Sequence, residues 1–199
     1  VRELVDRLNV SDMTIRRDLD VLSAGGFAVK VHGGATRPMH LSAEEPGFEV
    51  KQHRQEHEKD AIARAAVALV EPGLAVGLSA GTTTWHLANR LLSIPNLTVV
   101  TNSPSVAQVF YRSNDHSVTV VLTGGVRTPS DALVGPLATA SLRSLHLDLV
   151  FMGVHGMDPE HGFTTPNLAE AETSQALIRS ARSLVVVADH TKWKTPGLA

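Results

Sequence analysis

Two neighbouring arginines near the start of the chain, Arg16 and Arg17, are residues that could read DNA. A guanidinium can donate two hydrogen bonds to guanine in the major groove, and Arg is the commonest reader of that base. Ser11, Met13 and Thr14 stand just before them and could reach the same groove. We therefore take these side chains as candidate DNA contacts.

Two helices are expected to position these candidates, because apolar residues recur there at helical spacing. Ser11 is a good N-cap for the second helix, and the break before it favours a helix-turn-helix, whose second helix presents its N-terminal side chains to the bases. Met13 and Arg17 should point away from the apolar face. The apolar positions are Val1, Leu4, Val5 and Leu8 in the first helix, and Ile15, Leu19 and Leu22 in the second.

A β-hairpin is expected next, because Phe27, Val29 and Val31 alternate with smaller or polar residues and 32–34 has the composition of a turn. Lys30 and His32 would then lie along a phosphate backbone. The alternative is that the helices and the strand only pack together and that the arginines are a solvated face. The capping, turn and basic residues occur together, which favours DNA binding.

A second group of residues could hold an anion. Small hydroxyl and glycine residues follow short apolar runs, and free backbone N–H groups at the start of a helix attract phosphate. Glycines also let a backbone approach a ligand closely. Any one of these segments taken alone could be an ordinary turn that binds no ligand. The candidate effector-binding residues are Ser79, Gly81, Thr82, Thr83, Thr84, Asn102, Gly124, Gly125, Asp148, Gly153, Glu170 and Lys192.

Alternating strands and helices are expected to bring that group together. Strands over 74–78, 97–100, 118–122, 149–152 and 184–188 alternate with helices that include 62–69, 103–111 and 168–181. This order predicts an α/β fold with a mostly parallel sheet and helices on both faces. Ligands of such sheets bind beyond the carboxyl ends of the strands. We expect a small phosphorylated ligand rich in hydroxyl groups.

The chain resembles the DeoR/GlpR family of bacterial transcriptional regulators. Its T-I-R-R-D-L and V-H-G-G-A strings stand at 14–19 and 31–35, and further family motifs follow in order: T-N-S at 101–103, T-G-G at 123–125 and T-T-P-N-x-x-E-A-E at 164–172. The resemblance implies a winged helix-turn-helix followed by a sensor domain similar in fold to ribose-5-phosphate isomerase and CoA-transferase-like proteins. It also implies that a phosphorylated sugar intermediate controls a repressor of carbohydrate genes.

Some positions depart from the family pattern. The family's D-S-G-T-T loop aligns with 79–83, where Ser79 and Ala80 replace Asp and Ser, and its A-D-S-S-K run aligns with 188–192. Ser174 stands where Lys is common. The polar groups available to sugar hydroxyls therefore differ, so the usual ligands are not carried over. Family members carry another helix before Val1, so we expect the chain to be N-terminally truncated, beginning inside its DNA-binding domain.

Composition narrows the class of protein further. The chain has 199 residues, of which 43% are hydrophobic and 19% charged, with a net charge of −2 and no cysteine. Thiol catalysis, disulfides and thiolate metal sites are thereby excluded. We expect a cytoplasmic protein with no membrane span, no cofactor and no metal; His53 and His57 are four apart but lack a third ligand nearby. The expected divisions are a DNA-binding domain (1–37), a linker (38–55) and an effector domain (56–199).

Residues 1–37 hold six Lys or Arg against five Asp or Glu. DNA affinity must therefore come from where the charges lie. Two-fold operator recognition would need a homo-oligomer, a dimer or a tetramer. The expected partners are double-stranded operator DNA and a phosphorylated sugar effector, with no membrane.

Two other functions compete with this interpretation. A phosphosugar isomerase would need a carboxylate base and a cation, and Asp148, Glu170, Glu172, Asp189 and Lys192 could provide them. Glu170 and Glu172, however, would project about 200° apart on a helix. A pure oligomerisation module with empty pockets is the other alternative. A ligand-dependent rise in melting temperature would exclude it.

Overall fold

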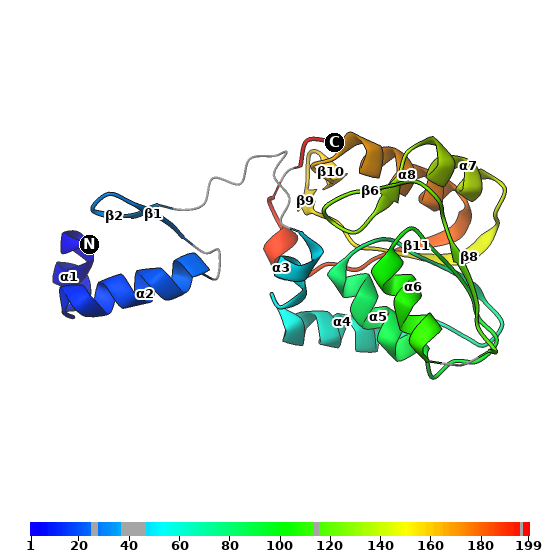
Figure 1. Cartoon of the computed structure of the whole chain (residues 1–199), viewed down its shortest axis with the longest axis horizontal. Coiled ribbons are helices and arrows are strands. Elements are labelled where there is room, and N and C mark those ends of the chain that lie inside the picture. Colours follow the sequence, from blue (N-terminus) through cyan, green and yellow to red (C-terminus); the bar gives the residue numbers. More distant parts are fainter. Residues whose placement is uncertain (25–27, 37–46, 114–115, 196) are drawn as a thin grey trace. The chain divides into compact units, whose positions relative to one another are not determined.

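The computed structural model describes residues 1–24, 28–36, 47–113, 116–195 and 197–199. The chain divides into two compact units, 1–41 and 42–199, which are considered separately (Figure 1). None of the helices in the described ranges combines the length and the apolar character that a bilayer crossing requires.

The smaller unit contains two helices and a two-stranded hairpin. Helix α1 (Arg2–Leu8) ends at Asn9, which adopts a left-handed conformation, and helix α2 (Asp12–Ala24) follows. The Thr14 amide donates to Ser11 Oγ at 3.1 Å, so Ser11 caps α2 as predicted. Strands β1 (Val29–Val31) and β2 (Gly34–Thr36) pair antiparallel around a turn at His32 and Gly33. The helices and the wing are therefore confirmed.

The apolar face of α2 is narrower than predicted. Ile15 and Leu19 are buried, but Leu22 is 43% exposed, which corrects its assignment to the buried face. Val29 and Val31 of the hairpin are both about half exposed. Phe27 lies outside the described residues. The described part of this unit thus buries few apolar side chains.

The larger unit is built on a five-stranded sheet in the order β11-β8-β3-β4-β5, with every neighbouring pair parallel. This confirms the predicted parallel sheet, although β11 begins three residues before the predicted strand. The strands are β3 (Ala75–Leu78), β4 (Thr98–Thr101), β5 (Thr119–Leu122), β8 (Leu147–Met152) and β11 (Ala181–Val186).

Helices cover both faces of this sheet, as predicted (Figure 1). Three of them, α4 (Glu56–Val67), α5 (Thr82–Leu91) and α6 (Pro104–Arg112), pack on one core with Phe151 and Leu78. The other face carries α7 (Pro136–Arg143) and α8 (Leu168–Arg179), around Leu142 and Leu177. Helix α8 ends two residues earlier than predicted, because Ala181 begins β11.

The buried face of α4 also differs from prediction. Ala63 and Ala66 are buried, whereas Ala65 and Leu69 are exposed, and α4 ends at Val67. Lys59 lies on the buried face. The apolar pattern was too weak in this alanine-rich helix to fix which side packs.

Several short elements were not predicted. Helix α3 (Phe48–Gln52) forms within the expected linker, where Phe48 is buried and its amide donates to Pro129 O at 3.2 Å. Residues 38–46 of that linker lie outside the described ranges, and the domain boundaries stay predictions. Two antiparallel hairpins, β6 (Val126–Arg127) with β7 (Leu133–Val134) and β9 (Gly156–Asp158) with β10 (Gly162–Thr164), and a 3-10 turn, η1 (His190–Lys192), complete the unit.

Candidate functional site

The start of α5, directly after β3, offers free hydrogen-bond donors. Gly81 is the N-cap and has no side chain to cap the helix, so the first-turn N–H groups have no side-chain acceptor within the described ranges. Thr82 and Thr83 are buried, and among the described residues their hydroxyls have no hydrogen-bond partner. Free N–H groups beside free hydroxyls are the chemistry that a phosphate needs.

Three of the predicted site residues hold the surrounding loops instead. Thr84 is fully buried, and its hydroxyl donates to Ser79 O at 2.7 Å. Ser79 Oγ accepts from Gly153 N at 3.0 Å, which joins the loops after β3 and β8. Asn102 Oδ1 accepts from Ala80 N at 2.9 Å, and its Nδ2 donates to Leu133 O at 3.2 Å. The structure thus brings 79–84, Asn102 and Gly153 together at the carboxyl edge of the sheet, and we call this group of loops the cradle. Ser79, Thr84 and Asn102 hold its loops in place by hydrogen bonds to backbone groups.

The loop after β5 contains a residue that our sequence reasoning missed. The Thr123 amide donates to Thr101 O at 3.0 Å, while its hydroxyl is buried and, within the described ranges, unpartnered. Gly125 has a φ of +135°, and a Cβ there would lie 2.5 Å from Val134 O. Close packing against β7 therefore explains this glycine, rather than approach to a ligand. In the T-G-G motif the threonine, not the glycines, has the spare polar group.

Asp148 lies at the wrong end of the sheet for the candidate site. It is the second residue of β8, and its Oδ2 accepts from Ala75 N at the start of β3, at 3.0 Å. The cradle residues follow the carboxyl ends of the strands, so Asp148 stands at the opposite edge. Asp148 is therefore not a candidate effector contact; the strand predicted over 149–152 already places it at the amino end of that strand, whereas ligands bind beyond the carboxyl end.

Glu170 is occupied by hydroxyl groups. Its Oε1 accepts from Thr128 Oγ1 at 2.5 Å and from the Ser130 hydroxyl, and its Oε2 accepts from Thr165 Oγ1 at 3.4 Å. The carboxylate therefore ties the first turn of α8 to the loop between β6 and β7. These hydrogen bonds indicate a structural role for Glu170 rather than contact with an effector.

Lys59 is a buried cation beside the loop that follows β11. It is 4% exposed, and its ammonium donates to Lys51 O at 2.5 Å. Burial lowers the pKa of Lys59 to about 8, and the nearby positive charge of Lys192 adds to the shift, while the Asp189 carboxylate opposes it. Lys59, Asp189 and Lys192 thus lie within electrostatic range of one another. Sequence reasoning missed Lys59 because its polar surroundings in the chain indicate a solvated run.

His86 of α5 adjoins the same cluster. Burial and the charge of Lys59 lower its pKa, and its Nε2 is buried without a hydrogen-bond partner in the described part of the chain. His53 meanwhile pairs its Nδ1 with Glu56 Oε1 at 3.0 Å. No group of three or more His, Asp or Glu side chains in the described ranges could hold a metal ion.

The predicted DNA contacts lie on the exposed first half of α2. Met13 is 78% exposed, and the Ser11 and Thr14 hydroxyls are 2.8 Å apart within the cap. Arg16 pairs with Asp12, and this guanidinium lowers the pKa of the Asp12 carboxyl. Arg17 is exposed and has no ion-pair partner among the described residues.

The two predicted contacts in the wing differ from each other. Lys30 forms an ion pair with Asp20, which links β1 to α2, whereas His32 is exposed in the turn beside Gly33, whose φ is +84°. Exposed ion pairs contribute little to stability. The pair can therefore open at low cost and free the Lys30 ammonium.

A small unit with an exposed, arginine-bearing helix and a wing, followed by a unit with a parallel α/β sheet, is the arrangement expected of DNA-binding regulators that carry a sensor domain. Residues 1–40 match the DeoR-like helix-turn-helix domain, and residues 54–199 match the DeoR C terminal sensor domain. The chain belongs to the DeoR family of transcriptional regulators.

Relatives support this assignment over nearly the whole chain. The uncharacterized HTH-type transcriptional regulator YgbI of Escherichia coli K12 is 38% identical over 194 residues, which are 97% of this chain and 74% of that protein. The lactose phosphotransferase system repressor of Staphylococcus aureus is 35% identical, covering 96% and 75%. The putative aga operon transcriptional repressor of E. coli O157:H7 is 34% identical, covering 100% and 74%.

Solved structures confirm the predicted fold of the larger unit. Ribose 5-phosphate isomerase A of Methanocaldococcus jannaschii has a TM-score of 0.51 at 16% identity, covering 69% of this chain and 54% of that one. The Pyrococcus horikoshii translation initiation factor eIF-2B has a TM-score of 0.50 at 14% identity, covering 73% and 50%. The chain spans about half the length of these structures, and the likeness concerns the fold alone.

Proposed function

We propose that this protein is a repressor of a carbohydrate-utilisation operon that releases its DNA operator when the larger unit binds a phosphorylated sugar. The observation that supports the effector most strongly is the start of α5, where the hydroxyls of Thr82 and Thr83 have no partner among the described residues and stand beside N–H groups without a side-chain cap. The named repressors among its relatives support the regulatory role.

The phosphate of the effector would accept hydrogen bonds from the N–H groups and hydroxyls of Thr82 and Thr83, with Gly81 keeping the approach open. The ammonium of Lys59 would supply positive charge, and Lys192 would add to it. Ser79, Thr84, Asn102 and Gly153 would fix the loops, and Thr123 and Gly124 would form the neighbouring rim. Binding to a preformed site saves the cost of ordering it.

The operator would be read by the exposed face of α2. Arg17 would contact a base edge, and Arg16 would leave its ion pair with Asp12 to contact the DNA. Met13 and Thr14 would lie against the DNA beside these arginines. Lys30 and His32 would follow the phosphate backbone. Two-fold operators require at least a dimer, and a homo-oligomer in the cytoplasm remains our prediction.

Release would follow from linkage between the two sites. An effector shifts the protein between operator-fitting and non-fitting arrangements only if it binds them with different affinities. The same coupling makes DNA weaken effector binding by an equal factor.

The isomerase alternative loses support from the arrangement of its carboxylates. Asp148 lies at the opposite edge of the sheet, and Glu170 is held by hydroxyl groups. The family comprises transcriptional regulators, so we do not assign an enzymatic activity.

The test is a gel-shift titration with operator fragments from the genes adjoining this one, repeated with sugar phosphates and with the unphosphorylated sugars. We expect release by at least one phosphorylated compound and none by its unphosphorylated counterpart. Release that does not depend on phosphate, or interconversion of the sugar phosphates by the protein, would contradict the proposal.

A further inference from the structure

A cavity lies in the larger unit, away from the start of α5. It occupies about 400 Å³ between α7 and α8, and His146 and Ser180, which directly precede β8 and β11, lie at its border. The strands are parallel, so these residues mark the amino edge of the sheet, whereas the cradle lies at the carboxyl edge. Its volume is in the range of small-molecule sites.

Two arginines stand in the lining of this groove. Arg143 of α7 and Arg179 of α8 face it together with His146, and Glu172 is the acidic residue in the lining. Arg179 donates to Gln175 Oε1 at 3.1 Å, and no ion pair engages Arg143, Arg179 or Glu172 among the described residues. A guanidinium has five N–H donors in a fork that matches carboxylate and phosphate oxygens.

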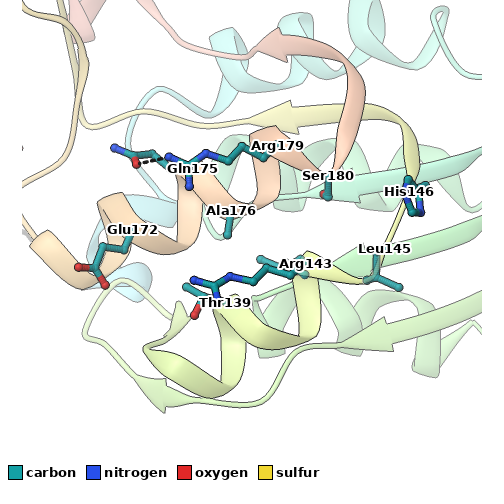
Figure 2. A pocket seen from close by; sticks show the side chains of 10 residues that line it. Thr139, Arg143, Leu145, His146, Glu172, Gln175, Ala176, Arg179 and Ser180 are labelled. Carbon is teal, nitrogen blue, oxygen red and sulfur yellow. Dashed lines mark hydrogen bonds between the residues drawn. The ribbon is translucent and has the colours of Figure 1, made fainter.

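Compensation of the helix dipoles does not account for the placement of the guanidiniums. Both arginines belong to the last turn of their helices, where a cation offsets the negative helix end. Figure 2 shows both side chains extended back along the groove, Arg143 toward Thr139 and Arg179 toward Gln175, with Glu172 beyond them. The charged groups therefore stand over the groove rather than over the helix ends.

The floor of the groove consists of well-packed apolar residues. Leu142 is fully buried and Ala176 is 8% exposed, and both belong to the core beneath the groove. The guanidiniums are thus mounted on two packed helices, which limits the ordering that a ligand would have to impose.

We propose that the groove between α7 and α8 binds a small metabolite that carries a phosphate or carboxylate group together with hydroxyl groups. The anionic group lies between Arg143 and Arg179, and Glu172 and Gln175 accept hydrogen bonds from the hydroxyls. This site is separate from the cradle at α5, so the protein has places for two different metabolites.

The test is isothermal titration calorimetry of the full chain with two probes, inorganic phosphate and citrate. The cradle itself is expected to take phosphate, so each probe is also titrated into Thr82→Val, which weakens binding at the cradle. A further loss caused by the arginine changes in this background then assigns the remaining binding to the groove. We expect at least one probe to bind this background, and the added change Arg143→Gln with Arg179→Gln to weaken that binding at least tenfold, since a hydrogen bond to a charged group contributes roughly a factor of ten. Arg143→Lys keeps the charge but loses the fork, and should weaken it less.

The matched control is Arg112→Gln, which removes an exposed last-turn arginine from α6 and should leave the affinity within about twofold. If Arg112→Gln lowered the probe affinity as much as the double change Arg143→Gln with Arg179→Gln (the groove variant), the binding would be diffuse charge attraction, and the proposal would be overturned. Failure of both probes to bind Thr82→Val would also overturn it. A change in oligomeric state of the groove variant without probe binding would assign the groove to contacts between copies instead. None of these outcomes bears on operator release, so this proposal and the proposed function fail separately.

Discussion

The two units of this protein place their polar groups in opposite ways. In the DNA-binding unit the candidate side chains are exposed, and within the described ranges Arg16 and Lys30 each pair with one exposed carboxylate. In the sensor unit Ser79, Thr84 and Asn102 are buried and bonded to backbone groups. The first arrangement leaves side chains free to adjust to a partner, and the second holds the loops after the strands in fixed positions.

The two units also differ in the size of their hydrophobic cores, and the sensor unit has the larger one. The described part of the smaller unit buries Ile15 and Leu19, while the larger unit packs helices onto both faces of a five-stranded sheet. The sensor unit therefore has the larger core, and truncation of a fully buried side chain there should have a large effect.

The largest effect is expected for Phe151→Ala. Phe151 is fully buried at the centre of the sheet, so its truncation should lower the free energy of unfolding of the sensor unit by about 3–5 kcal/mol. Urea denaturation followed by circular dichroism measures it. Leu22→Ala in α2 is the control and should change stability by no more than about 0.5 kcal/mol. Similar losses for both would remove the contrast between the units.

The buried charge of Lys59 should appear as a pH dependence of stability. Its folded pKa of about 8 lies below the ordinary value of 10.5, so between these values the unfolded chain binds the extra proton. The free energy of unfolding should therefore rise with pH across this window as the cost of the buried charge is relieved. Lys59→Met should flatten this rise, measured by urea denaturation from pH 7.5 to 10. The same substitution at the exposed Lys194 should leave the slope unchanged; an unaltered slope in Lys59→Met would show that the ammonium is solvated.

Arg17→Ala should separate the two units functionally. Loss of a base contact should weaken operator binding by about tenfold or more, because a good bidentate contact discriminates by that amount. The melting-temperature rise produced by the effector should stay the same. Arg182→Ala, an exposed arginine of β11, is the control for overall charge. Equal operator affinity for wild type and Arg17→Ala would exclude Arg17 as a base reader.

Thr82→Val should have the smallest effect, confined to the sensor. The isosteric change removes one hydroxyl donor, so effector affinity should fall by roughly threefold to tenfold, while operator affinity is retained. Thermal-shift titrations measure the change. Thr98→Val, at the amino end of β4, is the matched control. A loss of operator binding in Thr82→Val would break the proposed division between the units.

Much of the fold could be predicted from the sequence because strong local signals agreed with the tertiary structure. The strands around Val76, Val99 and Val150 are short, apolar and buried, and Ser11 caps its helix as its residue type indicates. The short elements escaped prediction because tertiary contacts define them: α3 forms where Phe48 packs and bonds to Pro129.

The candidate site could be predicted in place but not in detail. The clustering of loops after the strands was foreseeable from topology, but the task of each side chain depends on distant partners. The Thr84 hydroxyl donates to backbone carbonyls, and Asp148 binds the backbone at the amino edge of the sheet. Lys59 lies near Asp189, which is 130 residues further along the chain. Spacing in the chain does not encode these contacts.

The most direct test of the central claim is to follow the backbone amide resonances of Thr82 and Thr83 by NMR during titration with the sugar phosphate that releases the operator. We predict that both amides shift with the phosphorylated compound, stay unchanged with its unphosphorylated counterpart, and reach saturation together with operator release. Release of the operator while these two amides stay unchanged would contradict the account.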